Sequence, residues 1–310
     1  MQLDIIVLFF ILGFIAKLIG SGLKLPDGFH HGISVFLMLA IGLKGGAALA
    51  ENLSSGLLIK ASFFILLGMF LPFIVFPILR WIGDFAAKDA ASIAAHYGSV
   101  SIGTYAVAVA LLESQQISYE SYFPLFVVLL EFPAMFVAVY LANQKSQSIP
   151  VKQWVSHILK NESIVLLFGG LIIGLVAHEQ SSKLTPLFSE LFSGVLALFL
   201  LCMGMDAAAK VNDLKKDAPF LMAVGTFGPM VNGLIGGVFA SLLGLSAGGI
   251  FLTIVLSASA SYIAVPIAMR SLIPDANHSY GMTTSLGITF PFNILVGMPV
   301  YWIMAEWFAK

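Results

Sequence analysis

The sequence predicts an all-α integral membrane protein with ten transmembrane helices, arranged as two inverted five-helix repeats in which helices four and nine are broken. The observations behind this fold class are an apolar composition, an uneven distribution of Lys and Arg between the loops, and a polar motif that recurs in both halves. Of 310 residues, 59% are hydrophobic and only 10% are charged. Soluble domains carry roughly 25% charged residues, so this chain lacks the charge for a water-facing surface.

Apolar runs recur along the chain, and a run of about 20 residues is long enough to cross a hydrocarbon core of about 30 Å. We expect membrane spans near residues 3–23, 29–50, 57–82, 91–112, 121–142, 163–178, 187–207, 218–243, 248–271 and 280–308. The first run has no positive charge before it and no small-residue cleavage site after it. This pattern indicates a span and not a removable signal peptide.

Lys and Arg residues predict the orientation, because loops facing the cytoplasm are enriched in them. When successive loops are assigned alternately to the two sides, one side carries Lys17, Lys24, Arg80, Lys88, Lys145, Lys152, Lys160, Lys210, Lys215, Lys216 and Arg270. The other side, which holds both termini, carries Lys44, Lys60, Lys183 and Lys310. We therefore expect a cell (inner) membrane protein with both termini outside the cytoplasm. With five spans in each half, the second half is then inverted relative to the first.

Two short runs of small polar residues interrupt the apolar sequence, Gly98 to Thr104 in the first half and Ser257 to Ser261 in the second. Ser99 and Ser101 precede Ser259 and Ser261 by the same 160 residues. Glu131-Phe132-Pro133 is likewise echoed by Thr289-Phe290-Pro291, and Gly42 by Gly204. Polar interruptions at matching places in two halves indicate the binding site of a transporter. The expected organisation is a repeat over 1–143, a cytoplasmic linker over 144–161, and a second repeat over 162–310.

The residue types in these runs predict that each span consists of two half-helices. Glycine disfavours a continuous helix, and serine offers the backbone competing hydrogen bonds. Pro266 is tolerated only in a first helical turn, so we expect the second half-helices to begin near Thr104 and near Ile263. Helix starts offer N–H groups and a positive dipole end to an anion. The predicted substrate-binding residues are Gly98, Ser99, Ser101, Thr104, Ser259 and Ser261. Tight packing of helices on small residues is the alternative.

Glu131 is the one carboxylate deep within a predicted span, and Asn293 lies near the equivalent place in span ten. An ionisable group at that depth costs at least ~2.5 kcal/mol if unpaired, so it usually faces a cation, a cavity or a proton path. We therefore assign both residues to a cation-coupling site. The alternatives are a protonated carboxyl bonded to a neighbouring helix, and an amide that joins two helices. For His96, just before the first break, we favour a neutral packed side chain.

The sequence contains little that indicates an enzyme, since Gly98 to Gly103 comes near a Gly-x-Ser-x-Gly motif but misses its spacing. There is no His-Glu-x-x-His pattern, no phosphate loop and no Cys pair, since Cys202 is the single cysteine. We expect no catalytic residues, no cofactor and no nucleic-acid partner. In the linker, apolar residues on one helical face predict a short helix, either in the headgroup layer or packed on the bundle: Val151, Trp154, Val155, Ile158 and Leu159.

Several segments in the same order resemble the cyanobacterial-type sodium-dependent bicarbonate transporters. They are Ile41 to Ala47, Gly98 to Glu113 with Ile117 to Glu120, Met203 to Asp206 with Asp213 to Lys216, and Ser257 to Asn277, together with Glu131-Phe132-Pro133-Ala134. The resemblance implies ten spans divided into a gate part and a core part, a trimer, and a substrate held between the two broken spans. It places bicarbonate at the serine positions and implies sodium as the coupling ion.

The chain departs from this resemblance in two places, after the second serine run and in the cytoplasmic linker, which is much shorter than the resemblance implies. Tyr262 stands after the second serine run, where the resemblance implies an acidic residue. The leading interpretation is a secondary transporter that takes up a small anion, bicarbonate, together with sodium. One alternative is a proton-coupled transporter of a small carboxylate, and another is a membrane sensor that binds an anion without moving it.

Overall fold

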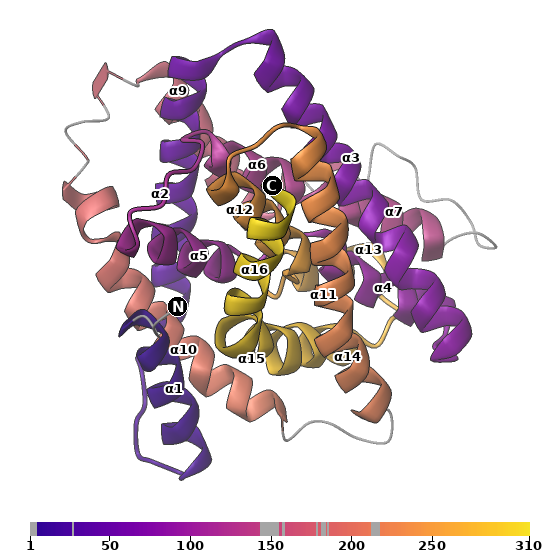
Figure 1. Ribbon diagram of the computed structural model, residues 1–310. Helices are drawn as coiled ribbons and strands as arrows, with labels where there is room; N and C mark the ends of the chain where they lie inside the picture. The colour runs from indigo at the N-terminus through magenta and orange to yellow at the C-terminus, as the bar shows by residue number, and fades with distance from the viewer. Residues whose placement is uncertain are drawn as a thin grey trace.

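The computed structural model describes residues 5–26, 28–142, 155–156, 159–177, 179–180, 184, 186–211 and 218–310 (Figure 1). These residues form helices and connecting segments and contain no β-strand, which confirms the all-α class. Of the predicted linker helix, residues 155–156 and 159–160 are described, and the rest lies outside the described residues.

Within the described part of the chain, seven helical stretches are long and apolar enough to cross a membrane, as expected for a multi-pass membrane protein. Three shorter apolar helices occupy the places of predicted spans one, six and nine: Ile5–Leu18, Glu162–Val176 and Ala247–Ala258. Every span that the sequence predicts therefore corresponds to a helix or an interrupted helix.

Four helices gather at the left of the view in Figure 1: α1 (Ile5–Leu18), α2 (Phe29–Asn52), α9 (Glu162–Val176) and α10 (Phe192–Val211). α2 packs on α9, and α1 packs on α10. Glycines allow this contact, because a Cβ at Gly46 would lie 2.0 Å from the carbonyl oxygen of Leu171, and one at Gly204 would lie 2.1 Å from that of Phe10. Small residues bring membrane helices this close together. A Cβ at Gly42 would likewise lie 2.5 Å from the carbonyl oxygen of Leu167, so the matched pair Gly42 and Gly204 serves helix packing.

The remaining helices form the second group, in which several predicted spans consist of two or more successive helical segments. They are α3 (Ser55–Pro77) with η1 (Ile78–Ile82), α4 (Ala87–Gly98) with α5 (Ile102–Ser114), α6 (Phe123–Leu130) with α7 (Pro133–Ala142), α11 (Ala218–Leu242), and α12 (Ala247–Ala258) with α13 (Ala264–Leu272). Span ten comprises α14 (His278–Met282), η4 (Thr283–Thr289), α15 (Phe290–Phe292), η5 (Asn293–Gly297) and α16 (Met298–Phe308). One short π-helical segment, η3 (Pro186–Glu190), precedes α10.

Spans four and nine are broken where the sequence predicts it. α4 ends at Gly98 and α5 begins at Ile102, while α12 ends at Ala258 and α13 begins at Ala264. The second half-helices thus start within two residues of the predicted positions. Pro266 lies in the first turn of α13, where its missing N–H leaves no helical hydrogen bond unmade.

A third interruption, at Glu131 and Phe132, divides span five into α6 and α7, although the sequence pattern alone suggests one continuous apolar helix. Pro133 explains it, because proline has no N–H and disfavours a helical conformation in the residue before it. The echoing Pro291 lies in span ten among π-helical segments. The two echoed Phe-Pro pairs therefore mark matched irregularities beside the two breaks.

Candidate functional site

The two breaks contact each other through direct hydrogen bonds. The backbone N–H of Ser101 donates to Ser259 Oγ at 3.0 Å, and the backbone N–H of Ser261 donates to the carbonyl oxygen of His96 at 2.8 Å. The breaks thus form one junction (Ser99–Ser101 with Ser259–Ser261), although 160 residues separate them in the sequence. All of these serines are buried, at 2% exposed or less, so the junction is closed to solvent in this structure.

His96 joins the two breaks from the end of α4. Its Nδ1 lies 2.5 Å from the carbonyl oxygen of Ser261, which requires the Nδ1 proton to be donated, and its own carbonyl accepts the Ser261 N–H. The two residues therefore exchange a pair of hydrogen bonds. His96 is fully buried, and its ring lies against Gly281 of α14. The packed histidine expected from the sequence is thus also the link between the breaks, and its place two residues before Gly98 is the only signal that could have suggested this.

Ser101 caps the N-terminus of α5. Its Oγ accepts hydrogen bonds from the backbone N–H of Thr104 at 3.1 Å and from the Thr104 hydroxyl at 2.8 Å. A hydroxyl has two acceptor lone pairs and one proton. With both lone pairs occupied, the Ser101 hydroxyl can serve a further group only as a donor. No carbonyl or carboxylate among the described residues accepts this proton, and the Tyr262 hydroxyl is its one neighbour of this kind at the edge of hydrogen-bonding range, so Ser101 is suited to donate to an anion.

The other serines of the junction differ in whether their hydroxyl groups donate a hydrogen bond to the protein. Ser99 donates to Glu131, with its Oγ 2.9 Å from Oε2 and 3.1 Å from the backbone oxygen. Ser259 donates to the carbonyl of Leu256 at 2.8 Å while it accepts the Ser101 N–H. Ser261 only accepts, from Val265 N at 3.5 Å. In the described part of the chain, Ser99 and Ser259 are therefore committed to the protein, and Ser101 and Ser261 keep a donor available.

The two predicted cation-coupling residues contact different breaks. Glu131 is bound to the first break through Ser99, as described above. Asn293 donates to the carbonyl of Ala258, at the end of α12, at 2.9 Å, and its oxygen accepts the Tyr301 hydroxyl at 2.6 Å. Both are buried, at 2% and 0% exposed. The structure thus brings each close to one break and keeps both from bulk water.

Gly98, also predicted to bind substrate, is required by packing. A Cβ there would lie 2.4 Å from Cγ of Pro72 in α3 and 2.8 Å from Cβ of Ala134 in α7. Contacts this short between real atoms do not occur, so only glycine fits between these two helices. Gly98 therefore fixes the position of the end of α4 beside the first break.

Tyr262 borders the junction, and its sequence position suggested only a missing acid and not a binding residue. Its ring packs edge-on against Phe290, with 5.1 Å between centroids. The side chain is 6% exposed, and its hydroxyl lies beside the start of α5 at Gly103. Only the tertiary structure could bring this residue of the second break to the half-helix of the first.

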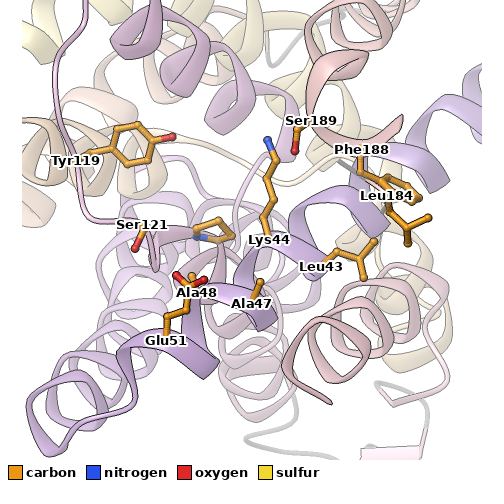
Figure 2. A pocket seen from close by; sticks show the side chains of 11 residues that line it. Leu43, Lys44, Ala47, Ala48, Glu51, Tyr119, Ser121, Leu184, Phe188 and Ser189 are labelled. Carbon is orange, nitrogen blue, oxygen red and sulfur yellow. The ribbon is translucent and has the colours of Figure 1, made fainter. Parts of the chain in front are cut away.

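A cavity of about 500 Å³ lies away from the junction, between α2, α6 and η3 (Figure 2). Lys44 extends into it toward Ser189, while the Glu51 carboxylate points to the other end. The Lys44 ammonium group also lies 4.6 Å from the centre of the Phe192 ring. The residues that line this cavity include none of those predicted to bind substrate.

Comparison with known proteins gives one match that covers almost the whole chain. The family model of the Na+-dependent bicarbonate transporter superfamily matches residues 6–306. No curated protein matches the chain. The matched range includes both breaks, Glu131 and Asn293.

Proposed function

The chain belongs to the Na+-dependent bicarbonate transporter superfamily, and from this premise we propose that it takes up bicarbonate across the cell membrane together with sodium. The family is one of transporters and not of enzymes. The observation that carries the proposal is the junction of the two breaks, where the N-terminus of α5 and two uncommitted serine donors lie together. Each feature suits a small oxyanion and needs no buried Lys or Arg.

The anion in this proposal binds at the junction through the Ser101 and Ser261 hydroxyls and the first N–H groups of α5. The N–H groups of Ile102 and Gly103 have no partner within their own helix, whereas that of Thr104 is bonded to Ser101 Oγ; the helix dipole favours negative charge there. Thr104 contributes indirectly, since its two bonds to Ser101 orient the Ser101 proton outward.

Sodium in this proposal binds beside Glu131, with Asn293 as a further oxygen donor. A carboxylate next to the first break would neutralise the cation, so that anion and cation cross the bilayer as a less charged pair. The energetic reason is that an uncompensated charge in the hydrocarbon core costs several kcal/mol. The hydrogen bond from Ser99 holds the carboxylate at the junction.

We further propose the five-plus-five inverted repeat, with both termini outside the cytoplasm. Helix pairing supports it: α2 packs on α9, and α10 packs on α1, as expected if α1 corresponds to α9 and α2 to α10. In the same way, α3 packs on α4 and α11 packs on α12. The predicted trimer and the gate and core parts also belong to this proposal. Because the junction is closed to solvent, transport requires it to open to each side in turn.

Uptake by proteoliposomes tests the proposal directly. Purified protein is reconstituted, and entry of labelled bicarbonate is measured with an inward sodium gradient, with equal sodium on both sides, and with an inward proton gradient in the absence of sodium. We expect concentrative uptake only with the sodium gradient. Uptake driven by protons alone would favour the proton-coupled alternative, with labelled acetate as the second substrate to assay. Binding without uptake under any gradient would indicate a sensor.

A further inference from the structure

The hydroxyl of Tyr262 is buried and makes no hydrogen bond of ordinary length and angle with a described residue; the Ser101 side chain interacts with it only at the edge of hydrogen-bonding range. Buried polar groups are almost always paired, and an exception calls for a missing water, ion or ligand. Tyr262 is more than nine-tenths buried, so bulk water does not satisfy it. A group that is absent from the structure is therefore expected next to this hydroxyl.

The direction in which the Tyr262 hydroxyl points indicates the chemical nature of its missing partner. A Cβ at Gly103 would lie 2.6 Å from the Tyr262 oxygen, and Gly103 is the second residue of the 13-residue helix α5. The hydroxyl thus faces the first turn of the helix, where unpaired N–H groups and the positive dipole end lie. A negatively charged oxygen bound there would accept from this hydroxyl and from the N–H groups of Ile102 and Gly103 at once.

Ser101 adds a second donor at the same place. Both lone pairs of its oxygen are occupied by Thr104, so its proton is directed away from α5. The hydroxyls of Ser101 and Tyr262 come from different breaks and lie side by side at this helix start. Two hydroxyl donors and the N–H groups of one helix end form an arrangement selective for an oxyanion.

We propose that Tyr262 is a substrate-binding residue, whose hydroxyl donates a hydrogen bond to the transported oxyanion at the N-terminus of α5. This inference rests on the proposed function and adds a specific contact to it. The phenol would close the binding site from the second break, so the anion would hold the two broken spans together. Phe290 and Phe199 form the apolar wall around the hydroxyl, since Phe199 lies 2.7 Å and Phe290 3.4 Å from the same Gly103 Cβ position.

Tyr262→Phe tests this role, because it removes the hydroxyl and keeps the ring contact with Phe290. Hydrogen bonds to charged groups imply a rise of about 10- to 150-fold in the KM for bicarbonate, with the apparent affinity for sodium unchanged. Tyr105→Phe is the matched control. Tyr105 belongs to the same helix α5 and is also buried, but its neighbours Tyr119 and Glu113 lie toward the opposite end of α5. The KM of the Tyr105→Phe variant for bicarbonate should equal that of the wild type.

Thermal unfolding in detergent gives a second measurement that does not depend on transport. Without bicarbonate, Tyr262→Phe should melt at or above the wild-type temperature, because it removes an unpaired buried group. Bicarbonate should raise the melting temperature of the wild type and of Tyr105→Phe more than that of Tyr262→Phe, since a ligand stabilises in proportion to its affinity.

The outcomes separate this inference from the proposed function. If the wild type responds to bicarbonate and Tyr262→Phe matches it in both KM and melting shift, Tyr262 does not contact the anion and its partner is a water molecule. If the wild type shows neither uptake nor a bicarbonate-dependent shift in melting temperature, the proposed function is wrong, and so is the anion-binding role of Tyr262. A lower melting temperature of Tyr262→Phe without ligand would show that the hydroxyl has a structural partner instead.

Discussion

The first and second breaks share a backbone design but differ in chemistry. Both interrupt an apolar span with serines at equal spacing, and each contributes one N–H bond to their junction. At the first break a carboxylate, Glu131, bonds to Ser99, whereas at the second an amide, Asn293, bonds to the carbonyl of Ala258. The two halves therefore interrupt their helices at equivalent positions, but only the first break has a carboxylate that could neutralise a cation.

The two breaks also differ in how their second half-helices begin. α5 has a serine cap, with Ser101 Oγ accepting from Thr104 N, whereas the capping position of α13 is Ile263, which makes no side-chain cap bond. Capping residues fix the first turn of a helix. The start of α5 is therefore the better-defined of the two helix starts.

Glu131→Gln should have the largest effect, because it removes the charge that distinguishes the first break. The amide keeps the size and can still accept from Ser99, so the fold should persist while sodium-driven uptake is lost. Labelled-bicarbonate uptake and bicarbonate binding are measured on the same preparation, and we expect uptake to fall far more than binding. Glu306→Gln, an exposed carboxylate in α16, is the control. Full sodium-driven uptake by the Glu131→Gln variant would show that the carboxylate is structural.

Ser101→Ala and Ser261→Ala should rank next, since each removes an uncommitted donor. A net loss of about 0.5–3 kcal/mol, depending on the charge of the partner, corresponds to a rise in KM of roughly 2- to 150-fold. Ser101→Ala should also lower the free energy of unfolding by about 0.5–2 kcal/mol through loss of the cap, whereas Ser261→Ala should not. Ser101→Thr, which keeps the hydroxyl, serves as the control. Wild-type KM in both alanine variants would favour a packing role for the serines.

Asn293→Leu sharpens the comparison from the second break. It leaves the Ala258 carbonyl and the Tyr301 hydroxyl without their present partner, and each unsatisfied buried group costs about 1–3 kcal/mol. We expect a lower denaturation midpoint together with a raised sodium requirement, measured as the sodium concentration at half-maximal uptake. Destabilisation with an unchanged sodium requirement would assign Asn293 to joining helices only.

Asp275→Asn should give the smallest effect. The Lys88 ammonium group of α4 donates to the Asp275 carboxylate after α13 and lowers the pKa of this exposed carboxyl below its ordinary value of 3.8. Its stabilisation is present above pH 3.8 and is lost as the pH falls through the lowered pKa. Exposed pairs contribute little, so the melting temperature at pH 7 and bicarbonate uptake should both stay close to wild type. A strong loss of uptake would show that this tie between the two broken spans controls their movement.

The positions of both breaks follow from local residue types alone. Gly98 and the serines disfavour helix through local backbone preferences, and Pro266 can begin a half-helix but not continue one, so the sequence was enough to predict where the helices stop. The depth of Glu131 in an apolar run likewise marked it before any contact was known. Pro133 carried a comparable local signal for the third interruption, but the strongly apolar residues around it pointed to a continuous span.

Which groups meet at the junction depends instead on tertiary packing. Hydrogen bonds between breaks that are 160 residues apart depend on how α4 and α12 pack, and no local preference encodes that packing. For this reason equivalent serines acquired different roles, with Ser99 and Ser259 bonded to the protein and Ser101 and Ser261 left with donors. The same packing carried Tyr262 to the start of α5 and bonded the His96 ring to Ser261. The sequence shows which residues carry hydroxyls. Their hydrogen-bond partners, and therefore which hydroxyl protons remain available to a ligand, depend on how the two halves pack together.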